Sequence, residues 1–168
     1  MLEIAQAETS EDLDAIRGLM RAFVAWHRER HVEDLGLIDR YFDAAGFKVE
    51  LAGLPGLYTP PRGRLLLARV DGEAAGCVAL RDLGDHFCEM KRMFLPPEFR
   101  RCGVGRALGE ALLREARQAG FRAMRLDTSR RQAEAIGLYE KLGFRRIAPY
   151  YTLPADMRDW LIFMEAEL

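Results

Sequence analysis

The chain has 168 residues, of which 49% are hydrophobic and 30% are charged, and its formal net charge is −1. This length and composition predict one soluble globular domain, residues 1–168, with a substantial buried core. The near-zero charge argues against a nucleic-acid partner. No apolar run is long enough for a membrane-spanning helix, so no membrane association is expected.

The N-terminus and the cysteines indicate the compartment. Residues 1–5 lack the basic and apolar regions of a secretory signal. The three cysteines, Cys77, Cys88 and Cys102, are odd in number and have no short pair spacing, which argues against disulfides or a zinc site. We therefore expect reduced thiols in a cytoplasmic protein.

The first quarter of the chain is predicted to form a strand followed by helices. Residues 4–7 are a plausible strand, and Thr9 and Ser10 can cap the helix that follows. The apolar face of that helix has helical spacing. It comprises Leu13, Ile16, Met20, Phe23 and His27. A second helical region is expected at residues 37–51, with an interruption near Gly46.

Three strands are predicted next, after a proline-rich loop at residues 57–63. Residues 64–70 and 74–83 are strand candidates, and Asp71-Gly72 between them is a strong hairpin signal. Residues 86–95 add a third antiparallel strand. These segments therefore form an antiparallel meander.

The second half of the chain alternates helices and strands. We expect a helix at 104–118, a strand at 122–128, a helix at 132–142 and a strand at about 144–153, followed by a last strand at 160–165. A meander followed by such crossovers predicts an α/β (α+β) fold, a mixed sheet flanked by helices.

A basic, glycine-containing turn stands between the third meander strand and the next helix. Residues 100–106 read Arg-Arg-Cys-Gly-Val-Gly-Arg. A helix N-terminus with exposed backbone N–H groups binds phosphate, and glycine lets the ligand approach the backbone. The spacing matches neither a dinucleotide-binding fingerprint nor a P-loop. A glycine turn with a solvated basic cluster is the alternative.

A second motif, Leu-Tyr-Glu-Lys-Leu-Gly-Phe, occupies residues 138–144. The two motifs together resemble those of the GNAT acetyltransferases. Arg100, Gly103 and Gly105 match the family's Arg/Gln-x-x-Gly-x-Gly/Ala pattern, and the segment from Ala135 matches its second pattern. Gln132 departs from it, because that family commonly has asparagine there.

The resemblance implies a mixed, mostly antiparallel sheet and an N-acetyltransferase that moves an acetyl group from acetyl-CoA to an amine. It implies acetyl-CoA as the acyl donor and a small-molecule or peptide amine as the acceptor, without a metal. The implied cofactor-binding residues are Met93, Phe94, Leu95, Arg100, Arg101, Cys102, Gly103, Val104, Gly105, Arg106, Ala107, Gln132, Leu138 and Tyr139. The pyrophosphate is expected to contact mainly backbone N–H groups, which would leave the side chains of Cys102 and Val104 free to vary.

The resemblance also implies a catalytic role for Tyr139. Tyr139 would be the general acid that protonates the departing thiolate; its alternative is a place in the buried stripe of its helix. Glu89 is the candidate general base, directly or through water. The alternative for Glu89 is an ordinary carboxylate paired with Lys91 or Arg92.

The expected reaction is direct attack in a ternary complex, in the cleft where strand 87–95 splays from strand 122–128. Phe94 and Leu95, at the end of the first of these strands, would pair with the pantetheine arm, and a backbone N–H there would polarise the thioester carbonyl. Two alternatives are a ping-pong route through Cys102 or Cys88 and a non-catalytic CoA-binding regulatory module.

Ser129 and Gln132 fit a capping box, which explains the glutamine without a ligand. His27 and His31 share a helix face, as a metal pair would, but no third ligand is evident, so we expect solvated or core-edge histidines.

Tyr150-Tyr151 and the loop 54–61 are candidates to line an acceptor pocket, with packing as the alternative. An apolar edge at residues 160–164 would permit a homodimer.

Overall fold

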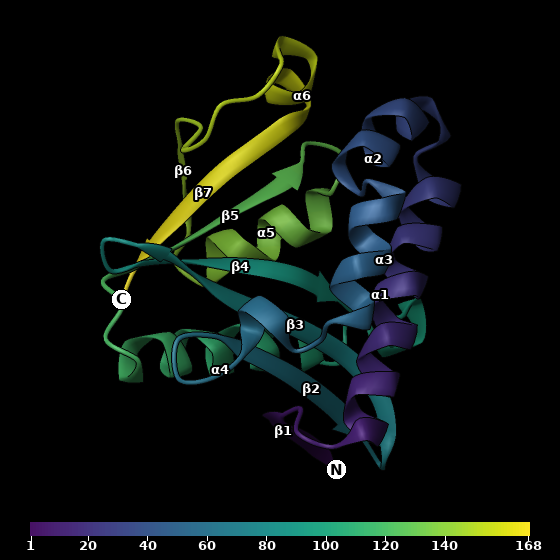
Figure 1. Ribbon diagram of the computed structural model, residues 1–168, viewed down its shortest axis with the longest axis vertical. Helices are drawn as coiled ribbons and strands as arrows, with labels where there is room; N and C mark the ends of the chain where they lie inside the picture. Colours follow the sequence, from purple (N-terminus) through teal and green to yellow (C-terminus); the bar gives the residue numbers. More distant parts are fainter.

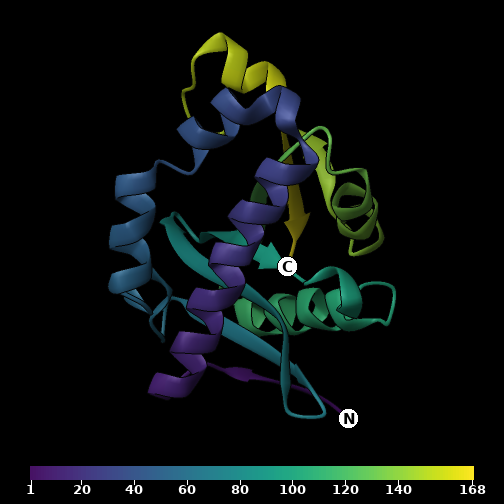
Figure 2. The same ribbon diagram turned by 90° about the vertical axis from the view of Figure 1, so that its right-hand side faces the viewer.

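A computed structural model describes all 168 residues as a seven-stranded sheet with helices on both faces (Figures 1 and 2). The strand order is β1-β2-β3-β4-β5-β7-β6. The strands are β1 (Leu2–Gln6), β2 (Arg64–Val70), β3 (Glu73–Gly84), β4 (Phe87–Phe94), β5 (Ala123–Ser129), β6 (Arg145–Ile147) and β7 (Leu161–Glu167). The helices are α1 (Ser10–Arg30), α2 (Leu35–Tyr41), α3 (Ala44–Ala52), α4 (Val104–Gln118), α5 (Ala133–Lys141) and α6 (Ala155–Trp160).

All neighbouring strands are antiparallel except β4 and β5, which are parallel. The predicted mixed, mostly antiparallel sheet is therefore confirmed. The hairpin between β2 and β3 also forms as predicted, because Asp71 and Gly72 both adopt the positive φ angles, 49° and 88°, that a tight two-residue turn requires. No helix is long and apolar enough to cross a lipid bilayer.

Strand β2 shows how the sequence builds two cores. Its residues alternate between the faces of the sheet, so Leu65 and Leu67 pack with α1, α2 and α3, whereas Leu66 and Ala68 pack with α4 and α5. Figure 2 shows α1 and α4 on opposite sides of the sheet. A sheet apolar on both faces needs helices on both sides, and the chain supplies them.

The start of α1 follows the prediction. The Thr9 hydroxyl accepts from the backbone N–H of Asp12, and the Asp12 carboxylate accepts from the backbone N–H of Thr9. The interruption predicted near Gly46 lies earlier, at Phe42 and Asp43, between α2 and α3. The Asp43 carboxylate accepts from the N–H of Gly46, so Gly46 lies inside the helix that Asp43 caps.

The predicted strand at 144–153 is wrong beyond its first residues. Only β6 forms there; a loop and α6 follow, and the last strand, β7, begins after Trp160. Pro149 lacks a backbone N–H for a strand ladder, and Pro154 stands directly before the first residue of α6, where its restricted φ suits a helix start.

The apolar edge proposed for residues 160–164 does not exist. Strand β7 lies between β5 and β6; β5 pairs with its whole length, whereas β6 pairs with Phe163, Met164 and Glu165. The side chains of Trp160, Phe163 and Met164 are buried within the chain. These three residues therefore belong to the core.

Candidate functional site

Strands β4 and β5 pair only where they begin. Their register runs from Phe87 opposite Ala123 to Glu89 opposite Arg125 and then stops, while β5 continues beside β7 to Ser129. Strand β4 also contains a bulge at Arg92, whose φ is 57°: one extra residue of β4 is accommodated against β3. The two strands therefore diverge (Figure 1), as predicted from the sequence for strands 87–95 and 122–128.

Two hollows border the diverging strands. The larger, which we call the basic cavity, has a volume of about 620 Å³ and lies between the end of β4, the start of α4 and the start of α5. The smaller, the inner pocket, has a volume of about 40 Å³ and lies between α1, α2, β4, β5 and Trp160. Phe23, Met93, Gln132 and Tyr139 line both hollows.

The start of α4 forms one wall of the basic cavity. Gly103 precedes the helix with a φ of 82° and offers no side chain to cap it. A side chain at Gly105 would place its Cβ 3.3 Å from Leu138 Cδ2 and 3.6 Å from Leu95 Cδ1, so glycine keeps this wall open. Uncapped N–H groups and the helix dipole favour an anion here.

The charged side chains around the basic cavity are mostly cationic. They are Arg30, Arg100, Arg101, Arg106, Arg131 and Lys141, against Glu134 as the one acidic residue. Such an excess of positive charge favours a polyanionic ligand such as a diphosphate.

The arginines predicted to contact phosphate differ in their surroundings. Arg100 donates from Nε to the Leu95 carbonyl oxygen at 2.9 Å, and its guanidinium lies 4.2 Å from the centre of the Trp26 ring. Burial lowers the pKa of Arg100. Arg101 and Arg106 are exposed. Arg100 therefore braces the end of β4, whereas the other two can reach a ligand in the cavity mouth.

Most of the residues predicted to contact the cofactor line the basic cavity. Those that do are Met93, Phe94, Leu95, Arg100, Arg101, Gly103, Gly105, Arg106, Gln132, Leu138 and Tyr139. Cys102, Val104 and Ala107 do not. The expectation that Val104 is free to vary is wrong, because its side chain is only 2% exposed and packs in the core beneath α4.

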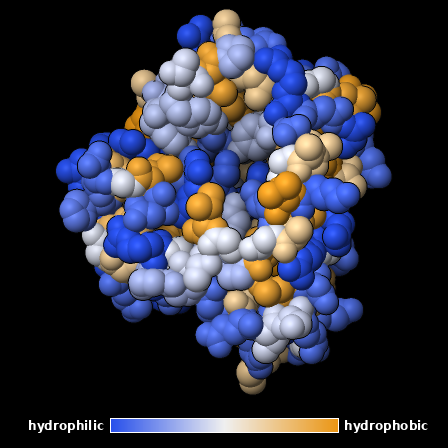
Figure 3. Space-filling model, viewed as in Figure 1, coloured by the Kyte–Doolittle hydropathy of each residue, from blue (hydrophilic) through white to orange (hydrophobic).

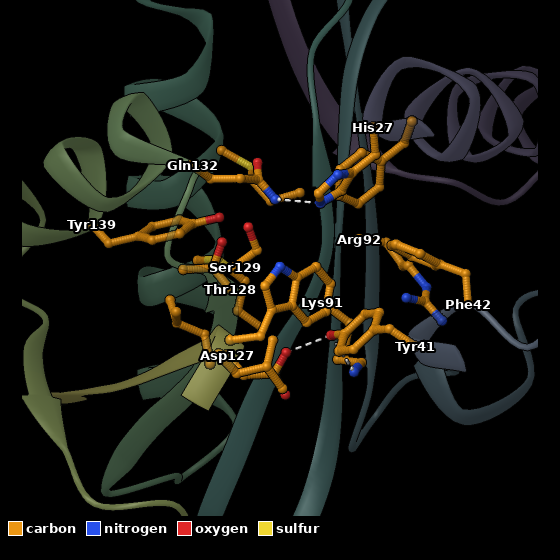
Figure 4. A pocket seen from close by; sticks show the side chains of 16 residues that line it. His27, Tyr41, Phe42, Lys91, Arg92, Asp127, Thr128, Ser129, Gln132 and Tyr139 are labelled. Atoms are coloured by element: carbon orange, nitrogen blue, oxygen red, sulfur yellow. Dashed lines mark hydrogen bonds between the residues drawn. The ribbon is translucent and has the colours of Figure 1, made fainter. Parts of the chain in front are cut away.

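The inner pocket is lined by aromatic and polar side chains (Figure 4). Tyr41, Phe42 and Trp160 supply aromatic walls, and Asp127 lies at the end of β5. The Tyr139 hydroxyl points into this pocket. In the space-filling view the face seen in Figure 1 is indented near its centre, with hydrophilic residues at depth (Figure 3).

Tyr139 belongs to the buried stripe of its helix and also faces the two hollows. Its ring packs in the core edge-on to Phe144, with ring centres 5.9 Å apart. It also borders both hollows. Burial, and next the negative charge of Asp127, raise the pKa of the Tyr139 hydroxyl, so it is held protonated as a hydrogen-bond donor.

Glu89 is buried, with 1% of its surface exposed, and lines neither hollow. Its carboxylate accepts from Arg81 Nε at 2.7 Å and from the Tyr150 hydroxyl at 2.5 Å, and Lys91 Nζ lies 3.8 Å away. Any proton that it receives from the inner pocket must therefore travel through another group or a water molecule.

The capping box predicted for Ser129 and Gln132 does not form. Helix α5 begins at Ala133, one turn later than that motif requires, and the Ser129 hydroxyl accepts from the N–H of Arg131. The Gln132 side chain reaches across to His27, with 3.2 Å between the two Nε2 atoms (Figure 4). Gln132, the residue that departs from the family pattern, thus has a side-chain partner on α1.

Histidines 27 and 31 lie in the walls of the hollows. Their ring centres are 5.1 Å apart, and burial lowers the pKa of both, that of His27 to about 4. His27 lines the inner pocket and His31 the basic cavity.

Most of the inner pocket has no signal in the sequence. Tyr41, Arg92, Asp127 and Trp160 come from separate elements and share no motif. Tyr150 and Tyr151, the predicted candidates, do not line the pocket. Instead the Tyr150 hydroxyl donates to Glu89 and the Tyr151 hydroxyl to Asp127. The loop 54–61 lies outside both hollows.

The family follows from comparison with known proteins. Residues 23–144 match the model of the acetyltransferase (GNAT) family. An uncharacterized N-acetyltransferase of Schizosaccharomyces pombe is 32% identical over 99% of this chain and 95% of its own length. The chain therefore belongs to the GNAT acetyltransferase family and is an N-acetyltransferase.

Other relatives differ in what their names describe. An IAA acetyltransferase of Azospirillum brasilense is 39% identical over 64% of this chain and 70% of its own length. Human N-acetylaspartate synthetase is 33% identical over 70% of this chain, which spans 40% of that protein.

Solved structures share the fold. The GNAT-family acetyltransferase of Staphylococcus aureus superposes with a TM-score of 0.75 at 17% identity, with 99% of each chain covered. The PaiA N-acetyltransferase of Thermoplasma acidophilum, solved in complex with coenzyme A, superposes with a TM-score of 0.73 at 19% identity, over 100% of this chain and 99% of the other.

Proposed function

We propose that residues 1–168 form one acetyltransferase domain that transfers the acetyl group of acetyl-CoA to an amine by direct attack in a ternary complex. The observation that carries this proposal is the position of Tyr139, between a large basic cavity and a small pocket, with its hydroxyl pointing into the pocket. One hollow suits the donor and the other suits the acceptor.

The basic cavity fits acetyl-CoA in size and charge. Its volume of about 620 Å³ lies within the range typical of ligand sites. The N-terminus of α4 would hold the pyrophosphate through backbone N–H groups, and Arg101 and Arg106 would add charge-assisted contacts. The end of β4, at Phe94 and Leu95, would pair with the pantetheine arm, which leads toward Tyr139.

Acetyl-CoA supplies an activated acyl group as a thioester. A backbone N–H at the end of β4 would stabilise the negative charge that develops on the carbonyl oxygen. As the amine nitrogen bonds to the carbonyl carbon and the carbon–sulfur bond breaks, the Tyr139 hydroxyl would give its proton to the sulfur. Glu89 is the proposed acceptor of the amine proton, through an intervening water.

The cysteines support direct transfer over an acyl-enzyme. Cys77 and Cys88 are buried, and burial raises the pKa of each thiol to about 12, which disfavours the nucleophilic thiolate. Cys102 is exposed, and its Sγ lies 3.4 Å from the Arg100 carbonyl oxygen, a contact that does not activate a thiol. A ping-pong route would need a group that removes the thiol proton.

The first test is calorimetric titration of the purified protein with acetyl-CoA, with adenosine diphosphate as a control. Micromolar binding of acetyl-CoA, tighter than that of the diphosphate, is the expected result. Absence of binding by a folded sample would overturn the proposed use of the basic cavity.

Replacement of Tyr139 by phenylalanine separates catalysis from cofactor binding. Tyr139→Phe should leave the acetyl-CoA dissociation constant nearly unchanged and lower kcat about 100-fold, a typical size for loss of a general acid. Tyr58→Phe is the matched control, because Tyr58 is also a buried tyrosine but lines neither hollow. Equal activity of Tyr139→Phe and the wild type would remove the acid role. Acetyl-CoA binding without acetylation of any amine would favour the alternative, a non-catalytic regulatory module.

A further inference from the structure

Asp127 is the one acidic residue among those that line the inner pocket. It stands on β5 beyond the point at which β4 and β5 cease to pair, opposite Phe163 of β7. It lies near Tyr139, since its charge contributes to the raised pKa of that hydroxyl. A carboxylate is thus fixed close to the group that marks the reaction centre.

The carboxylate of Asp127 has no cationic partner within 4 Å, unlike the other acidic groups of the interior. Glu89 is paired with Arg81, Glu50 with Arg92, Asp34 with Arg131 and Glu165 with Arg125. No ion pair includes Asp127. Partial burial of an unpaired carboxylate costs free energy, and a bound cation lowers that cost by balancing the charge.

Neutral donors hold Asp127 in place. The hydroxyl of Tyr41 donates to Oδ1, and that of Tyr151 donates to Oδ2 at 2.6 Å. Burial, and next the charge of Asp127, raise the pKa of both phenols, so both remain protonated donors. Two hydroxyl groups fix the orientation of the carboxylate and leave its negative charge in the pocket.

Neither of the two cations that border the inner pocket contacts Asp127 directly. Arg92 donates from Nε and Nη2 to the Glu50 carboxylate at 2.8 and 3.0 Å. Lys91 Nζ lies 3.3 Å from the Tyr41 hydroxyl, which itself donates to Asp127, and 3.8 Å from Glu89. The Asp127 carboxylate therefore keeps room for a directly bound cation.

The walls around this charge are aromatic. The rings of Tyr41 and Trp160 lie edge to face with centres 6.0 Å apart, and the rings of Tyr41 and Phe42 lie 4.8 Å apart. Aromatic faces beside a carboxylate favour a cation. The pocket volume of about 40 Å³ leaves room for about three water molecules, so only a narrow group enters.

We propose that Asp127 binds the ammonium group of the acceptor, and that the acceptor is a small aliphatic primary amine that carries a positive charge in solution. The proposal rests on the proposed function and adds its substrate class. Asp127 selects the acceptor by charge. Before attack the bound ammonium loses one proton through water to Glu89, and the proton that the nitrogen loses on forming the amide replaces the one that Tyr139 gives to sulfur. Tyr41 and Tyr151 position the carboxylate.

The test uses two amines with the same carbon skeleton that differ in charge. Ethylamine is protonated at neutral pH, whereas 2,2,2-trifluoroethylamine is largely neutral. Release of CoA thiol gives kcat/KM for each amine with wild type and with Asp127→Asn. The difference in intrinsic reactivity between the amines cancels when the ratio of the two values is compared between the proteins.

We expect Asp127→Asn to lower kcat/KM for ethylamine at least tenfold, as the loss of a hydrogen-bonded charge pair would, and to change the value for trifluoroethylamine less than threefold. Asp39→Asn is the control, because Asp39 is exposed on α2 and lines neither hollow. Asp127→Ser, also neutral, provides the same readout if the asparagine variant does not fold.

Calorimetry with acetyl-CoA distinguishes failure of the proposed function from failure of the role proposed for Asp127. If the wild type binds no acetyl-CoA, the proposed function itself is overturned. If acetyl-CoA binds but wild type acetylates neither amine, or Asp127→Asn affects both amines equally, only the substrate class and the role of Asp127 are overturned.

Discussion

The two hollows beside the diverging strands are built in different ways. The basic cavity, of about 620 Å³, has the backbone of the turn at Gly103 and of the start of α4 as one wall, beside the end of β4, α1 and α5. The inner pocket, of about 40 Å³, is lined by side chains from α1, α2, β4, β5, α5 and α6. A site that binds its ligand through backbone N–H groups tolerates changes of side chain but depends on the φ and ψ angles of its residues. A site formed by side chains depends on their charges and therefore on pH.

The largest effect should arise at the inner pocket, from His27 in acid. Burial, and next the nearby His31, lower the pKa of His27 from 6.5 to about 4, whereas Asp34 acts in the opposite sense. Between these pH values the unfolded chain binds a proton that the folded protein does not, so stability falls as the pH falls. The loss should reach about 3 kcal/mol and saturate below the folded pKa.

Urea unfolding between neutral pH and about pH 4 measures this effect. His27→Gln removes the titrating group, so its free energy of unfolding should fall less steeply with acid than that of the wild type. Replacement of the exposed His86 by glutamine is the control. His31 faces the same cluster and adds a loss of the same sign. Parallel pH profiles for wild type and His27→Gln would contradict the assignment.

The next effect should arise at the basic cavity, from backbone geometry. Gly103 and Gly120 lie at opposite ends of α4 with nearly equal φ angles, 82° and 86°, and at neither residue would an added Cβ meet another atom within 4 Å. Alanine at either residue should cost stability by roughly 1–2 kcal/mol through the same strain. Only Gly103→Ala should also weaken acetyl-CoA binding, by about tenfold.

Calorimetry and thermal unfolding of both variants test this comparison. Equal shifts in Tm with a weaker acetyl-CoA affinity in Gly103→Ala alone are the expected pattern. Equal loss of affinity in both variants would mean that the strain acts through the whole helix and not at the ligand.

The difference between the hollows also explains what the sequence could predict. The basic cavity depends on a local pattern, because a strand, a glycine turn and a helix start are consecutive in the chain. Arg100, Gly103, Gly105 and Tyr139 could therefore be placed from their motifs. The antiparallel meander was accessible for the same reason, since its strands follow chain order, whereas β7 lies between β5 and β6, against chain order.

The inner pocket depends on contacts between distant residues. Tyr41 and Asp127 meet across 86 positions of the chain, and Gln132 and His27 across 105. No spacing rule places such pairs. The error at Gln132 has the same cause: Ser129 and Gln132 satisfied a local capping rule, but a partner on α1 determines where the glutamine side chain goes. A single sequence cannot reveal that competition.

The smallest effect should come from the exposed cations at the mouth of the basic cavity. Arg106 is 68% exposed at its side chain and paired with Glu110 at 2.8 Å, so its attraction to a phosphate is screened by water and salt. Arg106→Gln should weaken acetyl-CoA binding about twofold to threefold at low ionic strength, and the difference should vanish at high salt. Arg114→Gln is the control, because Arg114 is exposed on the same helix but lies outside the cavity lining. A loss that persists in high salt would mean that Arg106 makes a desolvated contact, and the mouth of the cavity would then close over the ligand more than its present exposure indicates.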